Sequence, residues 1–183
     1  MILKLAKVLW DLHEDIEDNA AHLMALPRAS HVLSRSHANI KTKSLQNLTS
    51  FNVITAQEIL GNPTYQAISY GGYRGLTREV QPTIQELKED MKILQAMGVK
   101  ILRTYNVHFP QAENLLKAIT ELKEEDKDFE MYVMLGAWID CKNAWTNQPV
   151  NHQLESDQNE GEIARAVSLA NKYRSIVKII AVG

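Results

Sequence analysis

Aromatic, cationic and hydrogen-bonding side chains gather where the apolar segments in the second half of the chain end. They are Tyr70, Tyr73, Arg74, Arg103, Tyr105, Trp138 and Asp140. Flat aromatic faces suit the C–H surfaces of sugars, and planar polar groups bind sugar hydroxyls. We therefore expect these side chains to bind a carbohydrate.

Several of these side chains also have a purely structural interpretation. Arg103 could form an ion pair, because an arginine buried at the mouth of a barrel needs a partner. Tyr70 and Tyr105 could fill the core while their hydroxyls stay in water, and Trp138 could cap the fold. Both interpretations remain open from the residue types alone.

Other residues give weaker indications of chemistry. Asp140 is the only carboxylate expected near these segment ends, where it could cap a loop or touch sugar hydroxyls. Trp145 in the following loop could extend a sugar-binding surface. The glycine-rich turn 71–75 lacks the lysine of a P-loop, and His13-Glu14 lacks the second histidine of a zinc-protease helix. We therefore expect neither a phosphate loop nor a metal site.

Strands and helices alternate from Gln66 onward. Four strands are predicted at 66–70, 99–105, 131–138 and 176–182, and three helices have apolar faces over 84–94, 115–122 and 163–173. This alternation predicts an α/β fold with a parallel sheet, in which ligands bind at the carboxyl ends of the strands. The last two strands are nearly continuous apolar runs, so we expect them to be covered on both faces. A long polar connection is expected over 141–159.

The beginning of the chain has a different character. Residues 1–54 are expected to form a helical extension and a polar linker, and 55–183 the α/β domain. The helix is indicated by an apolar stripe of Leu5, Val8, Leu9, Leu12 and Ile16, and it ends at Pro27. The opening is similar to a signal peptide, but charged residues from Asp11 onward interrupt it. No targeting segment is therefore predicted.

Composition excludes several classes of function. Apolar residues make up 45% of the chain and charged residues 23%, and the net charge is −2. Such a balance gives no basic field for nucleic acid. The apolar runs are too short to span a bilayer. Cys141 is the single cysteine, so no intrachain disulfide can form.

Four segments resemble, in order and spacing, the first four strands of glycoside hydrolase family 17, which contains glucan endo-1,3-β-glucosidases. They are AISYGGYRG, GVKILRTYNV, VMLGAWID and IVKIIAVG. The resemblance covers about 55–183 and implies a partial (β/α)8 TIM-type barrel. It also implies a β-glucan ligand, bound by a wall that includes Tyr70, Tyr73, Arg103, Tyr105 and Trp138, and no cofactor. Members of the family are often extracytoplasmic.

The resemblance further implies retaining hydrolysis by two glutamates. The acid/base follows a glycine that corresponds to Gly183, and the nucleophile lies on a seventh strand, so neither has a counterpart in this chain. We therefore expect a fragment of a glycosidase that is inactive alone. The alternative is a non-catalytic glucan-binding or protein-interaction module. The first and fourth strands would be sheet edges, which favours self-association.

Overall fold

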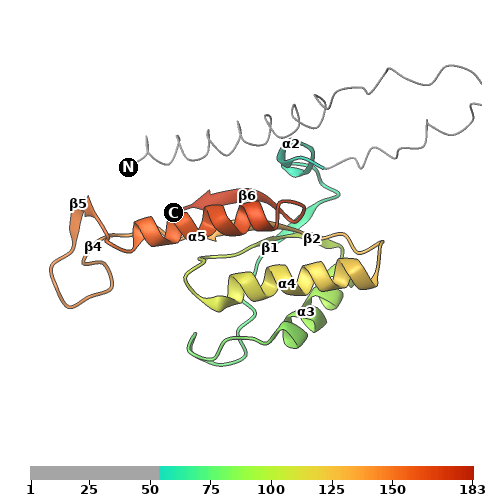
Figure 1. The fold of residues 1–183 in the computed structure, drawn as a ribbon, viewed down its shortest axis with the longest axis horizontal. Helices are drawn as coiled ribbons and strands as arrows, with labels where there is room; N and C mark the ends of the chain where they lie inside the picture. Colours follow the sequence, from blue (N-terminus) through green and yellow to red (C-terminus); the bar gives the residue numbers. More distant parts are fainter. Residues whose placement is uncertain (1–53) are drawn as a thin grey trace, which may run out of the picture. The chain divides into compact units, whose positions relative to one another are not determined.

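The computed structural model describes residues 54–183 (Figure 1). The predicted amphipathic helix and polar linker fall mostly on residues 1–53, outside the described residues. All described residues belong to one compact unit that begins at Val53.

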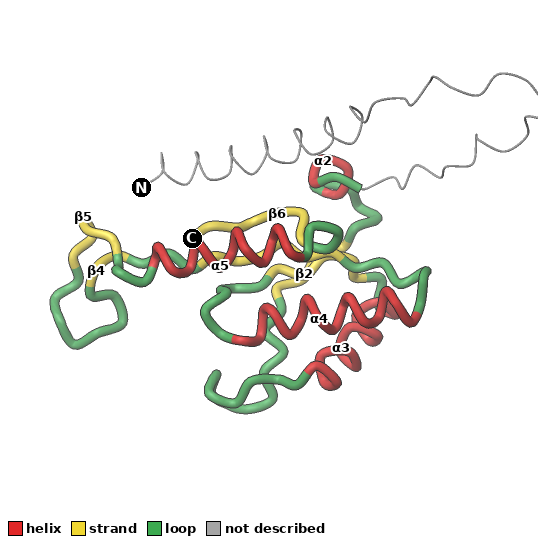
Figure 2. Tube along the Cα trace, in the orientation of Figure 1, coloured by secondary structure: helices red, strands yellow, loops and turns green. Residues whose placement is uncertain are grey.

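Four strands form a parallel sheet in the order β1-β2-β3-β6. Their bounds are β1 Gln66–Ser69, β2 Val99–Arg103, β3 Tyr132–Ala137 and β6 Val177–Val182. Helices α3 (Ile84–Ala96), α4 (Pro110–Glu125) and α5 (Asn159–Lys172) connect them in turn, as Figure 2 shows. The four predicted strands and three predicted helices are thus confirmed. A short helix, α2 (Ala56–Ile59), precedes β1.

Local signals begin and end these helices. Thr83 caps α3 through a reciprocal pair with Glu86, and Gly98 follows that helix with φ +84°, a conformation that glycine adopts without strain. Pro110 begins α4, where a missing backbone N–H costs nothing. These signals position the turns that lead into and out of β2.

The three long helices build the core against one face of the sheet. Helices α3 and α4 pack on each other, and α5 packs on β3 and β6. The largest fully buried side chains of this core are Leu87, Met91, Leu102, Leu115, Leu116, Ile119, Leu122, Met131, Val133, Leu135 and Ile176. The alternation of strands and helices in one layered unit is compatible with part of an α/β barrel.

The expectation that the last two strands are covered on both faces is wrong for β6. Only Val177 of β6 is buried, and the rest of that strand is half-buried or exposed. In β3, Val133 and Leu135 are buried while Tyr132 and Met134 are half-buried. The described helices cover one face, and β1 and β6 are the edges of the sheet. An apolar run therefore does not by itself guarantee two covered faces.

The long polar connection expected over 141–159 contains a small hairpin. Strands β4 (Cys141–Lys142) and β5 (Asn151–Glu155) pair antiparallel, and Figure 1 shows them beyond the beginning of α5. All of β5 is exposed, so no alternation of apolar residues indicates it in the sequence. The hairpin carries two residues with left-handed backbone, Asn143 at φ 65° and Trp145 at φ 62°.

Candidate functional site

Two of the predicted site residues lie at the carboxyl end of β2. Arg103 is paired in register with Ser69 of β1 and Met134 of β3. Its side chain is exposed. The alternative interpretation of Arg103, a buried residue in a structural ion pair, is therefore wrong for the described residues. Tyr105 is 37% exposed. Both side chains can reach a ligand at the sheet edge.

A glycine brings the ends of β2 and β3 close together. A Cβ atom on Gly136 would lie 2.6 Å from the carbonyl carbon of Tyr105 and 2.7 Å from its oxygen, closer than real contacts allow. The Gly136 amide donates to Oγ1 of buried Thr104 at 2.9 Å. The missing side chain thus lets the backbone that carries Arg103 and Tyr105 pack directly on β3.

Two other predicted site residues are bound to α3. Tyr70 packs against the core, and its hydroxyl donates to Oδ2 of Asp90 at 2.5 Å. Arg74 donates to the same oxygen at 2.9 Å and to the Glu86 carbonyl at 3.0 Å. Burial and then the Asp90 hydrogen bond raise the pKa of Tyr70, which stays neutral. These contacts leave little of Tyr70 for a ligand.

Tyr73 lies in the glycine-rich turn between them. It is half-buried, and its ring would contact a Cβ atom placed on Gly71. Gly72 has φ +70°, and a Cβ there would lie 2.6 Å from the Tyr70 hydroxyl and 2.9 Å from Leu87. The turn therefore requires glycine for two reasons, backbone conformation and space.

Asp140 joins two tryptophans after β3. Its Oδ2 accepts the indole N–H of Trp138 at 2.8 Å, and its Oδ1 accepts that of Trp145 at 3.2 Å. The two ring centroids are 6.3 Å apart and the rings are tilted by 53°. Trp138 is half-buried, whereas Trp145 is 83% exposed. The carboxylate therefore sets the orientation of both indoles.

The first turn of α5 holds the backbone that carries this group. Asn159, 2% exposed, accepts from the Asp140 amide at 3.0 Å and donates to the Asp140 carbonyl at 2.8 Å. Glu162, 3% exposed, accepts through Oε1 from the amides of Val107 at 2.7 Å and Trp138 at 3.1 Å. Two buried side chains of one helix thus fasten the segments after β2 and β3.

Glu162 corrects the expectation that Asp140 is the only carboxylate near the strand ends. Its Oε2 lies 3.4 Å from Nδ1 of His108 but has no hydrogen-bond donor among residues 54–183. Reasoning from strand ends alone misses this position, because Glu162 lies on a helix. A carboxylate in the first turn of a helix that follows a strand is a usable signal, since that turn lies beside the same sheet edge.

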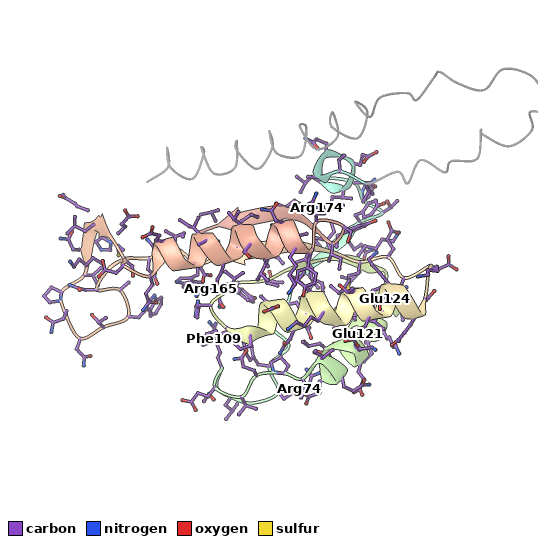
Figure 3. The ribbon with its side chains drawn as sticks, viewed as in Figure 1. Arg74, Phe109, Glu121, Glu124, Arg165 and Arg174 are labelled. Carbon is purple, nitrogen blue, oxygen red and sulfur yellow. The ribbon has the colours of Figure 1, made fainter. Side chains whose placement is uncertain are left out.

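An open-sided hollow of about 620 Å³ lies among these segments. Its lining includes Arg78, His108, Phe109, Trp138, Asp140, Trp145, Asp157 and Arg165. Figure 3 shows Phe109 at the beginning of α4 and Arg165 on α5, the helices beside the hollow. The lining combines aromatic faces with guanidinium and carboxylate groups, the chemistry that binds polyhydroxylated ligands.

Within 54–183, no group of three or more histidine, cysteine, aspartate or glutamate side chains is placed to hold a metal ion. No helix in that range is long and apolar enough to cross a membrane.

The chain is an α/β protein in which aromatic and hydrogen-bonding side chains gather near the carboxyl ends of the strands of a parallel sheet. Comparison with solved structures finds a similar chain, an endo-laminarinase from Formosa Hel1_33_131. The two share 65% sequence identity and superpose with a TM-score of 0.70. The match covers 71% of this chain and 33% of the other, so this chain spans about a third of that laminarinase. No protein-family model and no curated protein matches the chain.

Proposed function

We propose that residues 55–183 form the sugar-binding part of a glucan-degrading glycosidase. The observation that carries this is the 65% identity to an endo-laminarinase, in a superposition with a TM-score of 0.70. The ligand is a β-1,3-glucan of the laminarin type. The domain is the first part of a (β/α)8 barrel of glycoside hydrolase family 17, and residues 1–54 are an extension of it.

The proposed sugar contacts lie at the carboxyl edge of the sheet. Arg103 and Tyr105 are open to a ligand at the end of β2, and Trp138 offers an aromatic face after β3. Tyr73 completes this wall from the glycine-rich turn. Tyr70 and Arg74 act by holding that turn on α3, because Asp90 binds both of them.

Hydrolysis is proposed for an enzyme that also has the two glutamates implied by the resemblance. Retaining hydrolysis requires two carboxyl groups about 5–5.5 Å apart across the scissile bond. Asp140 accepts from two indoles, and Oε1 of Glu162 accepts from two backbone amides, so both carboxylates have structural roles here. We therefore expect the 183-residue chain to bind glucan without cleaving it.

Isothermal titration calorimetry with laminari-oligosaccharides tests this proposal. Arg103→Ala is expected to weaken binding about tenfold or more, because it removes a charged hydrogen-bond donor. Arg174→Ala is the matched control, since Arg174 is an exposed arginine beyond the other end of α5 (Figure 3). No binding by the parent chain, or equal loss in both variants, would contradict the proposal.

A non-catalytic role is the second candidate. The observation in its favour is that Asp140 and Glu162, two of the carboxylates that line the hollow, already have structural partners. A reducing-sugar assay on laminarin separates the two candidates when the chain is compared with a longer protein that contains it.

We also propose that the chain associates with itself through the edge strands β1 and β6, where Ile68 and Val182 are 42% and 41% exposed. Sedimentation would report the mass of the complex.

A further inference from the structure

We propose that Trp145 is the platform of an additional glucosyl-binding subsite, with Asp140 as its positioning residue. This inference rests on the proposed function and extends it to a surface beyond the sheet edge. The subsite occupies the part of the 620 Å³ hollow that borders the β4–β5 hairpin.

The exposure and the backbone conformation of Trp145 are both unfavourable for a residue that has no ligand. The ring is 83% exposed, so it contributes little apolar burial to the fold. Its backbone has φ 62°, a conformation that costs about 1–3 kcal/mol for a bulky residue and persists where surrounding structure enforces it. The indole N–H donates to Oδ1 of Asp140 at 3.2 Å, and this contact orients the ring. The ring is thereby held outward with a defined orientation.

A sequence of contacts reaches from the core to this ring. Asn159 and Glu162 of α5 fix the backbone at positions 140 and 138 by three hydrogen bonds of 2.8–3.1 Å. Asp140 then uses one oxygen for each indole. A site held by such supporting contacts loses little conformational entropy when a ligand binds. The arrangement therefore suits a rigid ligand that stacks on an aromatic face.

The lining favours a neutral polar ligand. The two guanidinium groups of the lining, Arg78 and Arg165, face three carboxylates, Asp140, Asp157 and Glu162, so positive charge does not dominate the hollow. This balance disfavours a phosphate or a nucleic acid, which requires a cationic surface. A glucose ring presents C–H groups to the indole and hydroxyls to the guanidinium groups and carboxylates. The occupant is therefore a glucosyl unit of the same glucan, one or more residues away from the unit at Arg103.

The test measures affinity as a function of oligosaccharide length with the full 183-residue chain. Trp145→Ala is expected to weaken binding of laminarihexaose about eightfold, as expected if a sugar covers about 50 Å² of the ring at about 25 cal/mol per Å². Laminaritriose, which we expect to occupy the site at Arg103 alone, should bind as before. Leu154→Ala is the control, because Leu154 is 51% exposed on the same hairpin and does not line the hollow.

Asp140→Asn tests the positioning role separately. An asparagine offers one acceptor oxygen instead of two, so one indole loses its partner. Hexaose binding should weaken, and the tryptophan emission spectrum of the free protein should change. Thermal unfolding of Trp145→Ala should match that of the parent, because the ring is exposed.

The outcomes are distinguishable. If the parent binds no oligosaccharide, the proposed function fails and this inference fails with it. If the parent binds but Trp145→Ala leaves hexaose affinity unchanged, the subsite is refuted while the proposed function stands. Equal weakening for triose and hexaose would place Trp145 in the main site and would also overturn an additional subsite.

Discussion

Replacing Glu162 by leucine should strongly destabilise the domain, although the substitution adds an apolar side chain to a buried position. Glu162 is 3% exposed, and its Oε1 accepts from the amides of Val107 and Trp138. Leucine accepts from neither. These amides belong to the segments after β2 and β3. We therefore expect the substitution to disturb the candidate site as well as to lower the stability of the fold.

The magnitude follows from the two amides. A buried donor left without an acceptor costs about 1–3 kcal/mol, so two cost about 2–6 kcal/mol. Removing a buried carboxylate whose Oε2 has no donor among residues 54–183 offsets part of this cost. We expect a net loss of about 2–4 kcal/mol, which is a large fraction of the stability of a typical domain. Glu162→Gln keeps the accepting oxygen and should lose less than about 1 kcal/mol.

Urea unfolding followed by tryptophan fluorescence measures both variants against the parent chain. The midpoint should fall steeply for leucine and little for glutamine, with an unchanged slope. Hydrogen exchange at the Val107 and Trp138 amides should accelerate in the leucine variant even where the rest of the domain is protected. A leucine variant whose free energy of unfolding lies within about 0.5 kcal/mol of the parent's would refute the reasoning, because two buried amides without acceptors should cost more than this.

Two further predictions concern the close approach of strands β2 and β3 and the half-buried phenol of Tyr132. Gly136→Ala should lower the free energy of unfolding by about 1–3 kcal/mol and weaken oligosaccharide binding, because the added Cβ would lie 2.6 Å from the backbone of Tyr105. Thermal unfolding measures the loss of stability. Gly161→Ala is the control and should not destabilise the domain, because its Cβ would meet only the Arg165 guanidinium at 3.7 Å. Burial first, and then the charge of Glu130, raises the pKa of Tyr132 to about 12. Because the unfolded pKa is about 10, this contribution to stability is complete below pH 10 and is lost as pH rises toward about 12. The parent should therefore lose unfolding free energy faster than Tyr132→Phe over that range, and a phenolate absorbance titrating at its ordinary pH would contradict this.

Local sequence signals are sufficient for the elements and for part of the site. Apolar runs mark β2, β3 and β6, and Gly98 and Pro110 mark a helix end and a helix start, because these effects act within a few residues. Carboxyl ends of parallel strands share one edge. For that reason the sequence alone assigns Arg103 and Trp138 to that edge.

The hairpin and the direction of individual side chains could not be predicted in this way. Strand β5 is polar and wholly exposed, so it has no apolar alternation to detect. Tyr70 has the chemistry of a ligand contact, yet Asp90, twenty residues away, binds its hydroxyl. Which partner a side chain finds depends on which helix packs beside it.

The sequence by itself determined the order of strands and helices and the kinds of side chain at their ends, since both follow from short-range pattern and backbone chemistry. Only the tertiary structure decided that Glu162 fastens two loops and that Asp140 orients two tryptophans. The bonds of Glu162 join residues 55 and 24 positions apart in the chain. Contacts over such separations exist only after the helices have packed on the sheet, and no local pattern encodes them.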